Sequence, residues 1–415
     1  MRAFVRVASI LSAAGLGAAG CFAATPVLAD ETANAAAVAH LEAGTLAAGE
    51  TELATMLAAD PANDDARMGL GTIRFVKAIE TLSQGLYRYG LQPPQSMMMP
   101  IVRLPVPPNP NPEPISYADF RGLLEGFVTD IGAAEKTLDG VGDSGVKLRL
   151  DLTKLRYDAD GDGKVTDDER FISVIQRVTG FRGEDMPPTL VFAFDKGDAL
   201  WLRGYCNVIM AFGDFWLAHD WHESFDVAFP HFFPKVESDF AKALARPGGD
   251  PMYAEAAPFA DFISFFHIRW PVTEPERMAA VRQHIKAMIG LSRESWDSIL
   301  AETDDDREWL PNPNQTSPFA SVQVDAGRIA AWRAVLDQAE LVIDGKKLVP
   351  HWRFDKGFNL ARVFDEPQAF DLVLWITGPA ALPYLEDGPV TTSLEWEAMI
   401  GAFEGSFGVS AIWYN

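Results

Sequence analysis

The sequence contains very little cysteine. Its 415 residues include two cysteines, Cys21 and Cys206, and the first lies in an N-terminal segment that we expect to be removed. A single remaining cysteine cannot form an internal disulfide, so the fold has to be held together by its hydrophobic core. Cys206 lies in the apolar run 205–212, where a buried and unreactive thiol is favoured over a nucleophile.

Basic residues are also scarce. The chain has 35 Lys and Arg residues against 58 Asp and Glu residues, which gives a formal net charge of −23 at pH 7. An acidic surface of this kind repels phosphate backbones and attracts cations, so we expect no nucleic-acid partner. Hydrophobic residues make up 48% and charged residues 22% of the chain, as in a soluble globular protein with a substantial core.

Long apolar runs are absent after the N-terminus. Residues 7–24 form a largely apolar stretch that follows Arg2 and Arg6, and Val27-Leu28-Ala29 precedes the first acidic residue. This order is typical of a secretory signal peptide with its cleavage site. We therefore expect residues 1–29 to be removed, to give a periplasmic or secreted protein without a transmembrane span.

Two alternatives to cleavage before Asp30 remain. The first is an uncleaved membrane anchor, which the glycines of the apolar stretch and the lack of a basic stop-transfer patch disfavour. The second is lipidation of Cys21, because Ala18-Ala19-Gly20-Cys21 resembles a bacterial lipoprotein cleavage box, although Ala18 stands where that box prefers Leu. Lipidation would place the protein on a membrane surface.

Helical periodicity dominates the rest of the chain and predicts a mainly α, multi-helical globular protein. Residues 30–91 are expected to form a helical hairpin, 92–115 a proline-rich extended connector, and 116–415 the main helical domain. The hairpin would consist of helices over 35–58 and 66–89. Further helices are expected over 117–138, with Ser116 as its N-cap, and over 167–178, 199–222, 235–245, 259–270, 274–289, 295–302, 326–343, 367–376 and 394–403.

The helical hairpin carries a weak family resemblance. Asp60-Pro61, Asn63, Ala66, Leu70-Gly71 and Ala78 are similar to the junction of a tetratricopeptide repeat. The similarity covers about one repeat unit, and no second copy follows at the 34-residue period of that family. A plain helical hairpin is therefore the favoured interpretation, with a peptide-binding solenoid as its alternative.

One acidic segment carries a specific chemical pattern. Residues 158–169 read Asp-Ala-Asp-Gly-Asp-Gly-Lys-Val-Thr-Asp-Asp-Glu, with acids at the first, third, fifth and twelfth positions and Gly163 at the sixth. Alternating carboxylates that curl around a sharp turn suit a hard cation, which takes six to eight oxygen ligands. A solvated acidic turn before a helix is the alternative.

These residues resemble the calcium loop of EF-hand proteins at every defining position. The resemblance implies a Ca²⁺ site whose ligands are the side chains or the backbone carbonyls of Asp158, Asp160, Asp162, Lys164, Thr166 and Glu169. Lys164 would contribute its carbonyl, Thr166 its hydroxyl or a bound water, and Glu169 both carboxylate oxygens.

The chain departs from a full EF-hand on both sides of the loop. Residues 146–152 alternate between apolar and polar side chains like a strand, where the family has a helix, and no second matching loop is present. A few short strands are therefore expected around a strand-loop-helix calcium site, with 189–194 as another strand. The run from Val191 to Asp198 is a degenerate candidate for a partner loop, with too few acids.

A second constellation consists of His219, His222 and Glu223, which are spaced i, i+3 and i+4. On one helix these residues would share a face and could bind a transition metal. Their order differs from that of the known zinc-protease motifs, so a polar helix end is favoured. The sequence also lacks a Gly-x-Ser-x-Gly nucleophile motif and a dinucleotide-binding glycine fingerprint.

Together these patterns predict an exported calcium-binding protein with one EF-hand-like loop. Its role would be that of a non-catalytic envelope scaffold or a module that binds another envelope protein. The alternative is a periplasmic metal-dependent hydrolase that uses His219, His222 and Glu223.

The first prediction concerns the N-terminus of the mature protein. Mass spectrometry of the protein purified from the producing cell is expected to find a chain that begins at Asp30. A chain that begins at a lipidated Cys21 would support the lipoprotein alternative, and an intact Met1 would contradict both forms of processing.

Overall fold

A computed structural model describes most of the chain: residues 31–92, 104–142, 145–179, 188–244, 260–261, 263–264, 267–318, 324–403 and 407–415. The expected signal peptide, Cys21, a part of the expected helix 259–270 and part of the proline-rich connector lie outside these residues. The described part confirms a mainly α, multi-helical protein, with 14 α-helices and a few short strands. None of its helices has the length and apolar character needed to cross a membrane.

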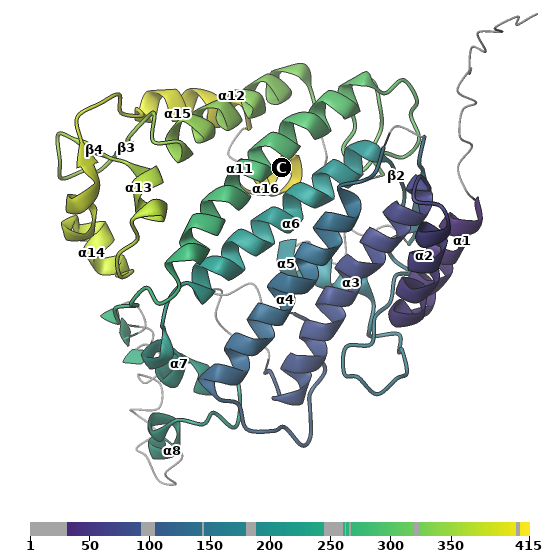
Figure 1. Cartoon of the computed structure of the whole chain (residues 1–415), viewed down its shortest axis with the longest axis horizontal. Helices are drawn as coiled ribbons and strands as arrows, with labels where there is room; N and C mark the ends of the chain where they lie inside the picture. Colours follow the sequence, from purple (N-terminus) through teal and green to yellow (C-terminus); the bar gives the residue numbers. More distant parts are fainter. Residues whose placement is uncertain are drawn as a thin grey trace, which may run out of the picture.

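Long helices packed side by side form the centre of the molecule (Figure 1). In spatial order they are α3 (Asp64–Arg88), α4 (Tyr117–Leu138), α6 (Lys196–Leu217) and α11 (Pro275–Ala301), with α12 (Ala326–Ile343) packed against α11. Most buried residues of α1 to α3 and of the later helices form one large hydrophobic core. A second cluster, rich in aromatic side chains, joins the C-terminal ends of α3 and α6 to Trp221, Phe225 and Phe229. Cys206 is buried in the large core, and burial raises the pKa of its thiol, which fits the unreactive role expected for it.

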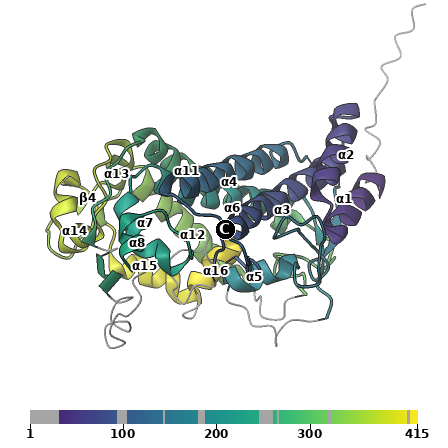
Figure 2. The same ribbon diagram turned by 90° about the horizontal axis from the view of Figure 1, so that it is seen from below.

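Smaller elements surround the central helices. Figure 2 shows α1 (Glu31–Ala43) and α2 (Leu46–Ala59) at one end of the molecule and the C-terminal elements α13 and α14 at the other. The remaining elements are α5 (Phe171–Thr179), α7 (His222–Ala228), α8 (Asp239–Leu244), α13 (Leu360–Asp365), α14 (Leu372–Thr377), α15 (Ser393–Ile400), α16 (Phe407–Tyr414), β1 (Leu148–Asp151), β2 (Val191–Phe194), β3 (Val349–Pro350), β4 (Gly357–Phe358) and β5 (Leu385–Glu386).

Local capping explains the helices whose bounds the sequence predicted best. The Ser116 side chain accepts from the Asp119 N–H while the Asp119 carboxylate accepts from the Ser116 N–H, so α4 begins where expected. Helix α12 also has its expected bounds, with Asp325 as its N-cap. The expected bounds of α6, 199–222, are wrong at both ends. This helix begins at Lys196, because Asp195 is its N-cap and Asp198 the reciprocal member of the capping box. It ends at Leu217.

Two predictions of helix continuity are wrong. The expected helix 35–58 is divided into α1 and α2 at Gly44, whose φ of +68° favours glycine. Conversely, the expected helices 274–289 and 295–302 form the single helix α11. Ile289, Trp296 and Ile299 are buried along this helix, so packing against α6 maintains it through Gly290.

The expected strand-loop-helix is present with a later helix start. Strands β1 and β2 pair antiparallel, with Leu148 opposite Phe194. Helix α5 begins at Phe171, not at residue 167, because the preceding backbone is used in a bridge between Arg156 and Arg170. The Tyr157 N–H donates to the Glu169 carbonyl, and the Phe171 N–H donates to that of Leu155, so residues 169 and 170 pair with the loop entrance before the helix begins.

The last described residues insert into the core between α6 and α11. The Tyr414 carbonyl accepts from the Trp296 indole N–H at 2.9 Å, and Trp413 stacks on Trp309. The three-stranded sheet β3-β4-β5 and helices α13 and α16 were not expected from the sequence, because their segments are too short to show a clear period.

The second prediction tests this core. Trp296 is completely buried, so Trp296→Ala should lower the free energy of unfolding by about 3–5 kcal/mol through lost contacts and the cavity left behind. Leu394→Ala removes an apolar side chain that is 74% exposed, and we expect it to change stability by less than about 0.5 kcal/mol. Urea denaturation of both variants measures the difference, and equal effects would contradict this account of the core.

Candidate metal centre

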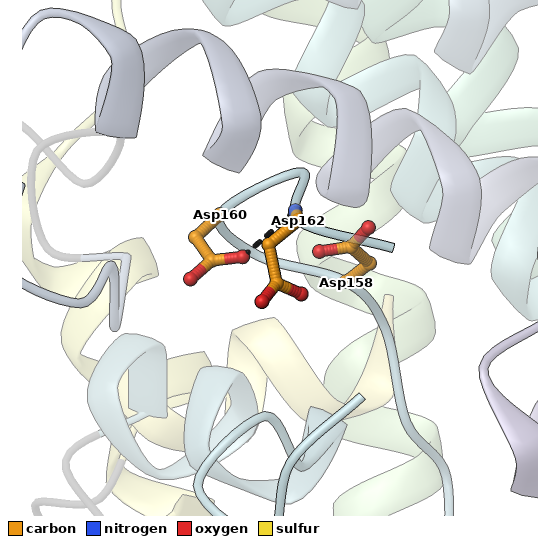
Figure 3. Close-up of side chains that lie close together, drawn as sticks. All are labelled: Asp158, Asp160 and Asp162. Atoms are coloured by element: carbon orange, nitrogen blue, oxygen red, sulfur yellow. Dashed lines mark hydrogen bonds between the residues drawn. The ribbon is translucent and has the colours of Figure 1, made fainter. Parts of the chain in front are cut away.

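The acidic loop 158–169 lies between β1 and α5 and brings three of the predicted ligands together. Asp158, Asp160 and Asp162 each place a carboxylate oxygen within 4.8 Å of the other two (Figure 3). All three belong to one turn, so the alternation seen in the sequence is sufficient to gather them.

Hydrogen bonds from the backbone to these carboxylates maintain the turn. The two oxygens of Asp158 accept from the N–H groups of Gly161 and Gly163 at 2.8 and 3.0 Å. Asp160 accepts from the Asp162 N–H, and Asp162 accepts from the Lys164 N–H. Gly161 and Gly163 have φ values of +76° and +77°, which residues with a Cβ rarely adopt.

Glu169 closes the loop and is the buried member of the predicted ligand set. One carboxylate oxygen accepts from the Ala159 N–H at 2.8 Å, and the other accepts from the N–H and hydroxyl of Thr166. Its carboxylate oxygens do not lie within 4.8 Å of all three aspartate carboxylates. An ionised carboxylate offers about four lone-pair sites, so these bonds leave Glu169 with capacity to bind a cation.

The other two predicted ligands lie in the same turn. The Lys164 N–H donates to Asp162, the N–H and hydroxyl of Thr166 donate to Glu169, and the Thr166 carbonyl accepts from the Glu169 N–H. Lys164 and Thr166 are both exposed. None of these hydrogen bonds uses the Lys164 carbonyl, which is the expected ligand atom of that residue.

Negative charge is concentrated in and around the loop. Partial burial raises the pKa of Asp160, and the charges of its acidic neighbours in the loop add to this. Glu80 of α3 accepts from the Asp158 N–H at 2.7 Å. Burial raises the pKa of Glu80 to about 7, and the charges of Asp158 and Glu169 contribute. A bound cation would relieve this repulsion.

The His219, His222 and Glu223 arrangement does not share a helical face, so that expectation is wrong. Helix α6 ends at Leu217, and His219 bridges to Val272 before α7 begins at His222. His219 is buried and its Nδ1 bonds to the Phe215 carbonyl, whereas the ring of His222 stacks on Tyr117. The Arg121 guanidinium donates to the carbonyl of Leu217, the last residue of α6, and to that of His219 just beyond it.

Sequence reasoning missed a second acidic cluster. Asp195, Glu302 and Glu308 place carboxylate oxygens within 4.8 Å of one another. Lys147 lies beside them, with its Nζ 3.9 Å from Asp195 and 2.5 Å from Asp304. Glu302 and Glu308 are distant from Asp195 in the sequence, so no local pattern could have identified the cluster.

Burial changes the protonation of this cluster. It raises the pKa of Glu302 to about 8, and the charge of Asp195 adds to the effect. The pKa values of Asp195, Asp198 and Glu308 are also raised, mainly by burial. The cluster therefore holds at least one proton at neutral pH, which distinguishes it from the exposed loop.

Comparison of the chain with protein-family models, with curated proteins and with solved structures finds no match. The chemistry of the two clusters therefore has to be inferred from their own donors. The loop provides oxygen ligands at regular spacing, which suits calcium.

The third prediction is a pH dependence. The pKa of Glu302 is higher in the folded protein than in the unfolded chain. Its contribution to the free energy of unfolding is therefore fully present below about pH 4.5 and is lost as the pH rises to about 8. Glu302→Gln should therefore weaken this loss and make the variant more stable than the wild type at pH 8. Urea denaturation at pH 5 and pH 8, in the presence of a chelator, measures the difference.

Glu294→Gln is the matched control, because Glu294 is an exposed residue of α11, the helix whose C-cap is Glu302. Its pH dependence should equal that of the wild type. A Glu302→Gln variant with the wild-type slope between pH 5 and pH 8 would show that Glu302 does not retain a proton.

Proposed function

We propose that this chain is an exported calcium-binding protein in which loop 158–169 binds one Ca²⁺ ion. The observation that carries the proposal is the convergence of the Asp158, Asp160 and Asp162 carboxylates within 4.8 Å in a turn of the EF-hand type. Glu169, which bonds to both ends of the loop, would complete the ligand set.

The chemistry of the donors favours calcium over other divalent ions. All of the expected ligands are oxygens, which hard cations prefer to the nitrogen and sulfur ligands typical of zinc sites. A loop with a bidentate carboxylate provides about seven oxygens at 2.3–2.6 Å, whereas Mg²⁺ requires a smaller octahedral site. Calcium outside the cytoplasm would be the natural occupant of an exported protein.

We further propose that the ion has a structural role in an envelope scaffold or partner-binding module. Calcium sensors use paired loops with helices on both sides, which open to expose a groove. Here the loop follows the short strand β1, and its carboxylates bond to the backbone of the loop itself. A loop built in this way supports a bound ion that stabilises the fold without a large opening motion.

The fourth prediction is that calcium stabilises the protein. A ligand that binds the folded state alone at a hundredfold excess over its Kd adds about 2.7 kcal/mol. Glu169→Gln keeps the shape of the side chain but removes one charge, and should abolish most of the calcium-dependent rise in Tm. Differential scanning calorimetry in calcium and in chelator measures this rise, and isothermal titration calorimetry gives the Kd, which we expect to be about 10⁻⁵–10⁻³ M.

Asp168→Asn is the matched control, because it removes one charge from an exposed residue that is not among the expected ligands. It should retain nearly the whole calcium effect, and magnesium should substitute poorly in the wild type. If the Tm of the wild type is the same in calcium and in chelator, and the protein binds no calcium at millimolar concentration, the proposed function is wrong.

A further inference from the structure

The calcium loop packs against α3, which comes from a distant part of the chain. The Gln84 side-chain amide donates to the Asp158 carbonyl at 2.8 Å, and the Glu80 carboxylate accepts from the Asp158 N–H at 2.7 Å. One turn of α3 therefore holds the peptide groups on both sides of the first ligand residue. Both side chains are partly buried, so water competes less for these bonds than at an exposed surface.

The α1–α2 hairpin contacts the same loop. Gly44, at the turn between the two helices, has no room for a side chain, since a Cβ there would lie 2.6 Å from Val165 Cγ2. The Arg156 N–H, just before the loop, donates to the Leu41 carbonyl at 2.9 Å. The hairpin is therefore attached both to the entrance of the loop and to its eighth position, Val165.

We propose that calcium binding and the docking of the α1–α2 hairpin are coupled, with Gln84 and Glu80 as the positioning residues of the loop. The inference rests on the proposed function and adds its consequence for the rest of the fold. Helix α3 and the hairpin supply contacts to the loop from outside it, and the ion stabilises the loop conformation to which the hairpin is docked.

The physical basis is the charge of the loop. Without a cation, its carboxylates repel one another, and the loop conformation that contacts Gly44 and Leu41 is less favourable. Calcium removes this penalty, so it strengthens every contact that requires the same conformation. The coupling is reciprocal, and contacts that hold the loop must therefore also raise its affinity for calcium.

Hydrogen–deuterium exchange of the full mature chain, with and without CaCl₂, tests the coupling. If undocking of the hairpin abolishes calcium binding, a hundredfold excess of calcium over Kd should slow exchange in residues 31–59 by up to about 100-fold. Residues 326–343 of α12, on the far side of the helix layer (Figure 1), provide the internal control through those of their amides that exchange by local opening, and not by global unfolding. They should show no comparable slowing.

Gln84→Ala tests the positioning role. Loss of one hydrogen bond to the loop backbone should weaken calcium binding by about 3- to 10-fold in isothermal titration calorimetry. The hairpin should then exchange faster at a fixed calcium concentration. Thr81→Ala is the control, because Thr81 is an exposed residue of the same helix, and it should leave both the Kd and the exchange unchanged.

Val165→Ala tests the contact with the hairpin from the side of the loop. The truncated side chain should reduce the calcium-dependent protection of residues 31–59 while the carboxylates remain intact. Failure of the proposed function and failure of the coupling give different results. A wild type that binds no calcium overturns both, whereas one that binds calcium without slower exchange in residues 31–59, or whose Kd is unchanged by Gln84→Ala, overturns the coupling alone.

Discussion

Electrostatic repulsion among the carboxylates of loop 158–169 is the constraint that the surrounding structure has to satisfy. Three aspartate side chains converge in one turn, and the buried Glu169 lies at the end of the same loop. Backbone N–H groups neutralise part of this charge, and glycines at positive φ let the chain turn tightly enough to present them. Helix α3 supports the loop from outside. A calcium ion would supply the remaining compensation.

The second acidic cluster also has to compensate repulsion among carboxylates, and it does so by burial and protonation. Asp195, Glu302 and Glu308 are brought together by the packing of α6 against α11, and Lys147 lies beside them. Burial keeps a proton on the cluster at neutral pH, whereas the loop is exposed for much of its length. Two groups of acids in one acidic protein therefore differ in chemistry because they differ in burial.

The order of helices explains how a small loop could affect a large fold. Helix α3 contacts the loop on one side and α4 on the other, and α4, α6 and α11 follow in the same layer. The α1–α2 hairpin lies at the edge of this layer and contacts both α3 and the loop (Figure 2). It is therefore the part of the fold that depends most directly on the conformation of residues 156–165.

The sequence by itself determined the features whose causes are local. Asp158, Asp160 and Asp162 lie in one turn, and the cap at Ser116 lies next to its helix. The strong periodicity of residues 117–138 and 326–343 predicted those helices to their exact bounds. Hydrogen bonds within a turn and between adjacent residues require no distant partner, so their pattern is readable in the order of the amino acids.

Tertiary structure alone decided the features that depend on distant partners. Helix α11 continues through Gly290 because α6 packs against it, and the pairing of Arg156 with Arg170 delays the start of α5. The contacts of Gln84 with Asp158 and of Asp195 with Glu302 join residues with no pattern in common. Such contacts follow from the burial of apolar surface between elements, which the sequence near either residue does not record.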